Sequence, residues 1–135
     1  MPATNRPIPV PDERSSPFFA AASRGQLLIK RCRACGRFLA PQRETCDACT
    51  GEALEWAPAS GRGTLYSFVF MHQVLHPAFQ EEAPYNVIVV ELDEGPRITS
   101  NLVGTPDDQI RVGMRLEVVF EQLSDAVAVP KFRAV

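Results

Sequence analysis

The chain has 135 residues and a formal net charge of −2; 45% of its residues are hydrophobic and 22% are charged. This balance is typical of a globular protein and excludes a disordered chain, and it gives no strong overall field for nucleic acid. The apolar run of residues 87–90 is far shorter than the ~20 residues of a membrane-spanning helix. We therefore expect a globular protein with no membrane segment, of one domain or two small ones.

The first 25 residues predict an arm and a short helix. Four prolines among residues 1–11 predict an extended arm, and this stretch lacks the apolar core of a signal peptide, so we expect a cytoplasmic protein. Ser16 is placed as the N-cap, Pro17 as the first helical residue and Gly25 as the C-terminal stop. A helix of two turns is unstable alone, so its phenylalanines must pack on this chain or on a partner.

All four cysteines of the chain lie within eighteen residues, as two Cys-x-x-Cys pairs. They are Cys32, Cys35, Cys46 and Cys49. A two-residue gap lets two thiolates bind one ion from a tight turn, and two such turns complete a tetrahedral sulfur cage, aided here by the permissive backbone of Gly36 and Gly51. The alternatives are two disulfides, a redox Cys-x-x-Cys, an iron–sulfur or rubredoxin-type iron centre, and unrelated thiols. The spacing favours structural Zn²⁺.

The segments around the cysteines predict three short strands. Residues 26–31 lead into the first pair, residues 38–40 leave it, and residues 54–56 follow the second pair. We interpret residues 26–60 as a rubredoxin-like zinc ribbon, because ~35 residues cannot assemble a core without a metal. Trp56 is expected to seal the joint to the next domain.

Charge is unevenly distributed along the chain. The stretch from Arg24 to Arg43 has no acidic residue and six basic ones: Arg24, Lys30, Arg31, Arg33, Arg37 and Arg43. From Gly61 onward there are six basic and ten acidic residues. The basic cluster either balances the two negative charges of a zinc–tetrathiolate centre or forms an anion-binding face. Both interpretations stay open.

Residues 61–135 predict a β barrel. Gly61-Arg62-Gly63 is interpreted as the hinge between the domains. Beyond it the hydrophobic period is two, and turn signals separate five predicted strands: residues 64–71, 85–92, 97–103, 114–121 and 126–132. Pro130 marks an edge or a bulge. Five strands without a long helix predict an OB-fold, so the fold class is mostly β.

Other candidate residues give weak signals. His72 and His76 are four apart, but Pro77 and the preceding strand favour extended or loop backbone, on which that spacing does not suit two metal ligands. Glu81-Glu82 is interpreted as a solvated loop pair and Asp107-Asp108 as turn chemistry. Nucleophile-elbow, phosphate-loop and dinucleotide motifs are absent from the sequence. These residues favour a non-catalytic binding subunit.

The order of these parts resembles a zinc-ribbon/OB-fold family long catalogued as a domain of unknown function (number thirty-five). The resemblance covers about residues 11–133. It is carried by these segments: Pro17-Phe18-Phe19, Cys32-Arg33-Ala34-Cys35-Gly36, Pro41, Cys46-Asp47-Ala48-Cys49, Leu54-Glu55-Trp56, Ser60-Gly61-Arg62-Gly63-Thr64, Pro84-Tyr85, Val90-Glu91-Leu92-Asp93-Glu94-Gly95 and Val112-Gly113-Met114.

The resemblance implies an accessory role in acyl-CoA (lipid) metabolism. Members of this family look like partners of thiolases, lipid-transfer-protein-like aldolases and acyltransferases. These larger enzymes form or cleave carbon–carbon bonds and carry the catalytic residues. We therefore expect a thiolase-like or lipid-transfer-protein-like subunit in trans, with acyl-CoA at the shared interface. No catalytic residue carries over. Arg33 and Arg37 are the residues expected to attract the CoA phosphates.

A nucleic-acid-binding zinc-ribbon/OB module is the alternative function. Tyr66, Phe68 and Phe70 have the period-two spacing of a stacking face. The acidic barrel argues against this function, and aromatic residues on one face of a strand more often form a core. A free-standing acyl-CoA enzyme is a third interpretation.

Overall fold

The computed structural model describes residues 10–72, 85–125 and 127–135. Helix α1 spans Ser16–Ser23, and the strands are β1 (Leu28–Cys32), β2 (Phe38–Leu39), β3 (Leu54–Pro58), β4 (Arg62–Met71), β5 (Tyr85–Leu92), β6 (Arg97–Ser100), β7 (Leu102–Val103), β8 (Arg115–Gln122) and β9 (Ala128–Ala134), with a 3-10 turn, η2, at Asp107–Gln109. The mostly β fold class is confirmed. No helix in these ranges has the length and apolar character needed to cross a membrane.

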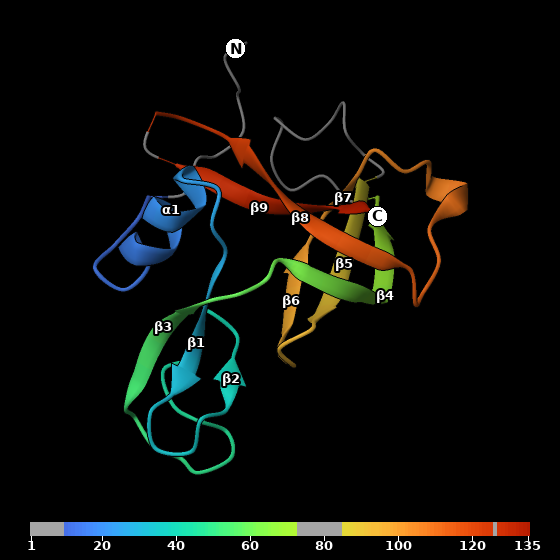
Figure 1. Ribbon diagram of the computed structural model, residues 1–135. Helices are drawn as coiled ribbons and strands as arrows, with labels where there is room; N and C mark the ends of the chain where they lie inside the picture. Colours follow the sequence, from blue (N-terminus) through green and yellow to red (C-terminus); the bar gives the residue numbers. More distant parts are fainter. Residues whose placement is uncertain (1–9, 73–84, 126) are drawn as a thin grey trace.

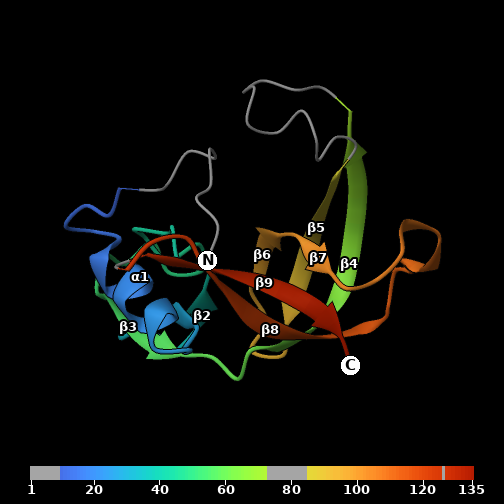
Figure 2. The same cartoon turned by 90° about the horizontal axis from the view of Figure 1, so that it is seen from above.

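Two sheets make up the structure. The small antiparallel sheet has the order β2-β1-β3, with Lys30 of β1 opposite Leu39 on one side and Trp56 on the other. The large sheet has the order β6-β5-β4-β8-β9-β7. Figure 1 shows α1 and the small sheet on one side of the large one, and Figure 2 shows β8 and β9 reaching across from the barrel toward α1.

The third predicted strand of the barrel is two strands in the structure. Its first half, β6, pairs with β5, and its second half, β7, pairs with β9 in parallel. The side chain of Asn86 on β5 bridges the change of partner, since its Nδ2 donates to the carbonyl oxygen of Leu102 and its Oδ1 accepts from the N–H of Leu102. This switch closes the barrel beside β9.

One apolar core spans both sheets. Eleven buried residues form it: Leu27, Ile29, Leu65, Ile88, Val90, Leu92, Ile98, Leu102, Ile110, Leu116 and Phe132. Leu27 and Ile29 belong to the ribbon segment, whereas the others belong to the barrel. Val118 and Phe120 of β8 pack on this core beside Leu116.

Helix α1 packs on its own chain. Ala21 and Ala22 are buried, and the ring of Phe18 lies 6.4 Å from that of Trp56. The N-cap is Ser15 rather than the predicted Ser16, because a turn stabilised by hydrogen bonds from Ser15 to Asp12 places the helix start one residue earlier. The same hydrogen bonds lower the pKa of Asp12.

Trp56 borders the joint between the ribbon and the barrel. Its ring lies against Phe18, and the Nζ of Lys30 is 4.9 Å from the ring centroid. The same ring lines a hollow whose other walls include β6 and β9 of the barrel. The buried part of the joint is made by Leu27 and Ile29, which belong to the shared core.

A β-bulge changes the faces of the β4 aromatic residues. The register with β5 shifts between Leu65 and Ser67. Phe68 and Phe70 consequently pack on the core, while Tyr66 is 47% exposed and lies under the guanidinium of Arg97, 3.7 Å from its ring centroid. The predicted shared face of Tyr66, Phe68 and Phe70 is wrong, because a bulge breaks the period of two.

The segment interpreted as a hinge is a packed part of the barrel. Gly61 and Gly63 are buried; residues 62–64 pair with β8, and residues 63–64 also pair with β5. A Cβ on Gly63 would lie 2.6 Å from the carbonyl oxygen of Glu91, and a Cβ on Gly61 would lie 2.4 Å from Cγ1 of Val118. These glycines allow strands to approach closely, which excludes a freely moving hinge.

Substitution of Gly63 tests this close approach. We expect Gly63→Ala to lower the free energy of unfolding by ~1–3 kcal/mol, because the added methyl meets backbone that cannot move without breaking the ladder. Urea denaturation measures the change, with Gln109→Ala, at an exposed position of η2, as the control. Equal stability of Gly63→Ala and the wild type would restore the hinge interpretation.

Candidate metal centre

The two cysteine turns have the same backbone hydrogen bonds. In the first, the N–H of Gly36 donates to the oxygen of Cys32, and the N–H of Cys32 donates to the oxygen of Arg37, both at 2.8 Å. In the second, the N–H of Thr50 donates to Cys46 at 2.9 Å, and the N–H of Cys46 donates to Gly51 at 2.8 Å. The shared Cys-x-x-Cys spacing thus folds into two equivalent knuckles.

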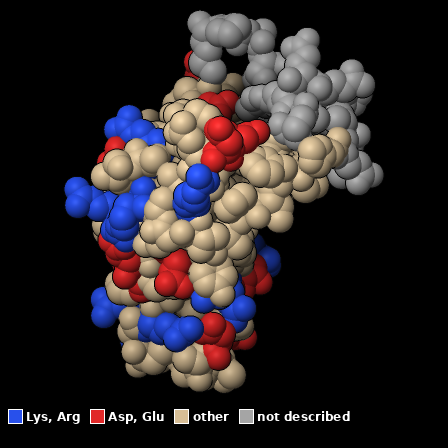
Figure 3. Space-filling view, turned by 90° about the vertical axis from the view of Figure 1, so that its right-hand side faces the viewer, with Lys and Arg blue, Asp and Glu red and all other residues tan. Residues whose placement is uncertain are grey.

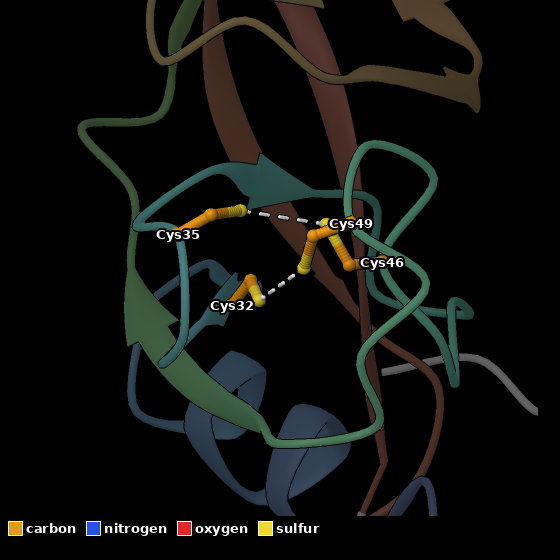
Figure 4. Close-up of side chains that lie close together, drawn as sticks. All are labelled: Cys32, Cys35, Cys46 and Cys49. Carbon is orange, nitrogen blue, oxygen red and sulfur yellow. Dashed lines mark hydrogen bonds between the residues drawn. The ribbon is translucent and has the colours of Figure 1, made fainter.

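The knuckles bring all four sulfur atoms together (Figure 4). The Sγ atoms lie within 4.8 Å of one another, and the Cys32–Cys49 and Cys35–Cys46 pairs are each 3.6 Å apart. Four sulfurs at ~2.3 Å from a central ion would be about 3.8 Å apart. The thiols are free, and 3.6 Å is far beyond the ~2.05 Å of a disulfide bond. The donor set fits a tetrahedral, thiophilic ion.

The two glycines near the knuckles have different roles. Gly36 has the predicted positive φ of 80°, but the equivalent position of the second knuckle is Thr50, with φ 59°. Gly51 is needed for space instead, since a Cβ there would lie 3.3 Å from the Sγ of Cys49. The permissive backbone expected at Gly51 is therefore not used, since its φ is not positive.

Backbone N–H groups lower the pKa values of the cysteine thiols, whereas neighbouring sulfurs raise that of Cys49. The N–H groups of Cys49 and Ala48 lower the pKa of Cys46 to about 7, and that of Cys35 is the main cause of the lowered pKa of Cys32. The N–H of Gly51 also lowers the pKa of Cys49, but the Cys32 and Cys46 sulfurs outweigh it and raise that pKa to about 12. Four thiolates so close together therefore require a cation.

The two predicted arginines do not line a common hollow. Arg33 borders a hollow of about 470 Å³ with Arg31 and Glu55. Arg37 forms an ion pair with Asp47, Nε to Oδ1 at 2.7 Å, and borders a hollow of about 650 Å³ between the ribbon and the β5–β6 turn. Arg33 is thus the more available of the two for an anion.

The remaining predicted residues lie apart from the cysteines. His72 is exposed after the end of β4, whereas His76, Glu81 and Glu82 lie outside the described residues. Asp107 and Asp108 begin the exposed turn η2, as predicted. Within the described ranges, the cysteines are the one group of three or more potential metal ligands with converging donor atoms.

Sequence reasoning missed a pocket of about 540 Å³ at the junction of α1, the ribbon and the barrel. Phe18 and Trp56 line it beside Ile98 and Pro130, and an ion pair between Arg14 and Glu44 lies at its rim. The sequence carries no signal for it, because its walls come from segments far apart in the chain.

Surface charge is mixed on the face seen in Figure 3. Lys and Arg atoms alternate there with Asp and Glu atoms. Ion pairs also occur within the barrel, such as Arg115–Asp93 at 2.9 Å and Arg133–Glu117 at 2.7 Å. This face offers no continuous basic track for a nucleic-acid backbone.

Two family models match consecutive parts of the chain. Residues 19–55 match "ChsH2, rubredoxin-like zinc ribbon domain", and residues 56–121 match "ChsH2, C-terminal OB-fold domain". The predicted combination of a zinc ribbon and an OB-fold is thereby confirmed.

Curated relatives agree with these matches. A probable enoyl-CoA hydratase alpha subunit of Thermomonospora curvata is 36% identical over 98% of this chain, which spans only 41% of that relative's length. A DUF35 domain-containing scaffold protein of Methanocaldococcus jannaschii is 34% identical over 73% of this chain and 70% of its own. The benzoylsuccinyl-CoA thiolase subunit BbsA of Thauera aromatica is 35% identical over 61% of this chain and 58% of its own.

A solved structure is similar along nearly the whole chain. The "Ltp2-ChsH2(DUF35) aldolase" chain superposes with a TM-score of 0.79 and 34% identity, covering 93% of this chain and 98% of that one. The family models and that structure share the name ChsH2, and that structure and the scaffold protein share the name DUF35. The chain belongs to the DUF35 family of zinc-ribbon/OB-fold proteins, of which ChsH2 is a member.

Proposed function

We propose that this chain is a cytoplasmic, non-catalytic accessory subunit that binds and stabilises a thiolase-superfamily acyl-CoA enzyme in trans. The observation that carries this proposal is the similarity along 93% of the chain to the ChsH2 part of an aldolase. The likeness to a subunit of a benzoylsuccinyl-CoA thiolase supports a thiolase-like partner. The partner would supply the residues that form or cleave the carbon–carbon bond.

The proposal includes a structural Zn²⁺ held by Cys32, Cys35, Cys46 and Cys49. The ribbon's own apolar cluster is small, consisting of Cys32, Leu39 and Cys46 with Leu54 packed against them. Bound zinc would cross-link the two knuckles, and such coordination contributes ~10–16 kcal/mol of apparent folding free energy. It would therefore replace the core that residues 26–60 cannot build.

The shape of the surface suits a binding subunit. The pocket at the junction of the domains has an aromatic wall from Phe18, Phe19 and Trp56, and its other walls come from both the ribbon and the barrel. A partner bound there would contact all three parts at once. Such composite concave sites are common places for ligands and partner side chains.

The proposal also gives Arg33 and Arg37 a role toward the CoA thioester. Both side chains are exposed on the ribbon, and guanidinium groups bind phosphate oxygens well. Because Asp47 already pairs with Arg37, Arg33 would make the larger contribution. Acyl-CoA bound at the interface would then be held by both proteins.

Removal of one cysteine tests the metal centre. We expect the wild type to contain one zinc ion per chain and Cys46→Ser to lose both the zinc and the folded ribbon, since ~10–16 kcal/mol is comparable with the whole stability of a small domain. Elemental analysis gives the zinc content, and the fluorescence of Trp56, the single tryptophan, reports on the ribbon.

Ala48→Ser is the matched control, because it adds a hydroxyl to the same exposed turn and keeps all four thiols. It should retain zinc and the wild-type spectrum. Zinc retained by Cys46→Ser, or iron in the wild type, would contradict the proposed centre.

Capture of the partner tests the accessory role. We expect the tagged chain to retain a stoichiometric thiolase-like protein from an extract of its source organism, identified by mass spectrometry. Nucleic acid is assayed in the same eluate. Retained nucleic acid without such an enzyme would favour the nucleic-acid-binding alternative.

Charge reversal tests the CoA contacts in the assembled complex. We expect Arg33→Glu to weaken acyl-CoA binding about two- to tenfold, because it removes an exposed attraction and adds a repulsion. Arg37→Glu should have a smaller effect, and Arg24→Glu, at the exposed end of α1, none. Calorimetry at low and high salt measures these affinities, and the differences should shrink at high salt. Unchanged affinity in Arg33→Glu would leave the arginines only the role of balancing the zinc site.

A further inference from the structure

The four cysteines differ in their exposure. Cys32 and Cys46 are 0% and 1% exposed, whereas Cys35 and Cys49 are exposed at the surface. Each sulfur contact of 3.6 Å joins an exposed cysteine of one knuckle to a buried cysteine of the other. Each exposed cysteine therefore has a buried cysteine of the other knuckle in contact with its sulfur.

Cys35 has an additional feature that favours reaction. It lines the hollow of about 470 Å³ that also contains Arg31 and Arg33. The Nη2 of Arg31 lies only 3.6 Å from the position that a Cβ on Gly36 would occupy, so this guanidinium lies beside the knuckle. The guanidinium groups offer hydrogen-bond donors to an anionic oxygen that leaves the sulfur, beside the carboxylate of Glu55 in the same hollow.

We propose that Cys35 is a modification site for small hydroperoxides and that Cys46 is its resolving cysteine. The proposal rests on the proposed zinc centre, which keeps the four sulfurs as thiolates. The hollow admits the oxidant, the exposed sulfur of Cys35 reacts first, and the buried sulfur of Cys46 completes the reaction.

The first step oxidises Cys35. Its thiolate attacks the terminal oxygen of the hydroperoxide, so an S–O bond forms and the O–O bond breaks. The departing alkoxide or hydroxide takes a proton from solvent. Cys35 becomes a sulfenic acid, and the peroxide is reduced to an alcohol or to water.

The second step forms the disulfide. The thiolate of Cys46 attacks the sulfur of Cys35, so an S–S bond forms and the S–O bond breaks, with hydroxide leaving and taking a proton. In sum, two thiolates, one hydroperoxide and two protons give one disulfide, one alcohol (or water) and one water. Only Cys32 and Cys49 then remain as thiolates, and two ligands do not retain the ion.

The Cys35–Cys46 disulfide differs from the disulfide of a redox Cys-x-x-Cys motif, which joins the two cysteines of one motif. The bond joins the two knuckles instead of closing one of them, because the sulfur contact runs between them. Cys46 is also part of the small ribbon core with Leu39 and Leu54, so its oxidation disturbs the packing next to β3. Trp56 lies on β3 and provides a signal for this change.

The experiment treats the reduced, full chain with hydrogen peroxide. Zinc content is measured first, zinc release is followed with a chromogenic chelator, and disulfides are mapped by mass spectrometry at early times after alkylation of free thiols. We expect Cys35–Cys46 as the first disulfide, with zinc released at the same rate. A first disulfide within a knuckle, or between Cys32 and Cys49, would overturn the proposal.

Arginine variants test the hollow without removing a thiol. Arg33→Ala should slow the formation of the disulfide about two- to fivefold, the effect expected for one exposed charge. Arg24→Ala, outside the hollow, should react at the wild-type rate. Equal rates for Arg33→Ala and Arg24→Ala would contradict the assigned role of the hollow.

The zinc measurement separates this proposal from the proposed metal centre. A chain isolated without zinc would contradict the metal centre, and the order of disulfide formation would still test the pairing of Cys35 with Cys46. A zinc-containing chain whose cysteines stay reduced would contradict the modification site alone.

Discussion

Sharing of one apolar core by the ribbon and the barrel is the constraint on which the structure depends. Leu27 and Ile29, at the start of the ribbon, are buried in the same core as Leu65, Ile88 and Phe132 of the barrel. The ribbon's own cluster contains two cysteines and Leu39, which is too little apolar area to support a fold. The orientation of the ribbon therefore comes from the barrel, while its internal order comes from the convergence of four sulfurs.

The sequence predicted the parts that follow simple periodic rules. The strand over 85–92 was predicted with its observed bounds, and the four cysteines converge as their spacing required. Composition and turn residues also gave the mostly β class. These features depend on neighbours in the chain, so a local pattern is sufficient to find them.

The errors occurred where tertiary contacts override a local pattern. The bulge at Tyr66 is set by the register with β5, and the division of residues 97–103 is set by the Asn86 side chain reaching Leu102. The sequence suggested a hinge that includes Gly63. In the structure Gly63 is held in a strand, because the backbone of β5 lies where a side chain would be. Thr50 takes the positive φ that glycine would take more easily, so the knuckle geometry overrides residue preference.

The cysteine cluster, the core and the surface are consequently coupled in this small protein. The pocket at the domain junction has walls from α1, from β1 and β3 of the ribbon, and from β6 and β9 of the barrel. Its shape exists only while the ribbon is ordered by its sulfurs and held on the barrel by Leu27 and Ile29. A change at the cysteines must therefore alter the surface that any partner would contact there. The state of the ribbon thus determines the shape of this part of the surface.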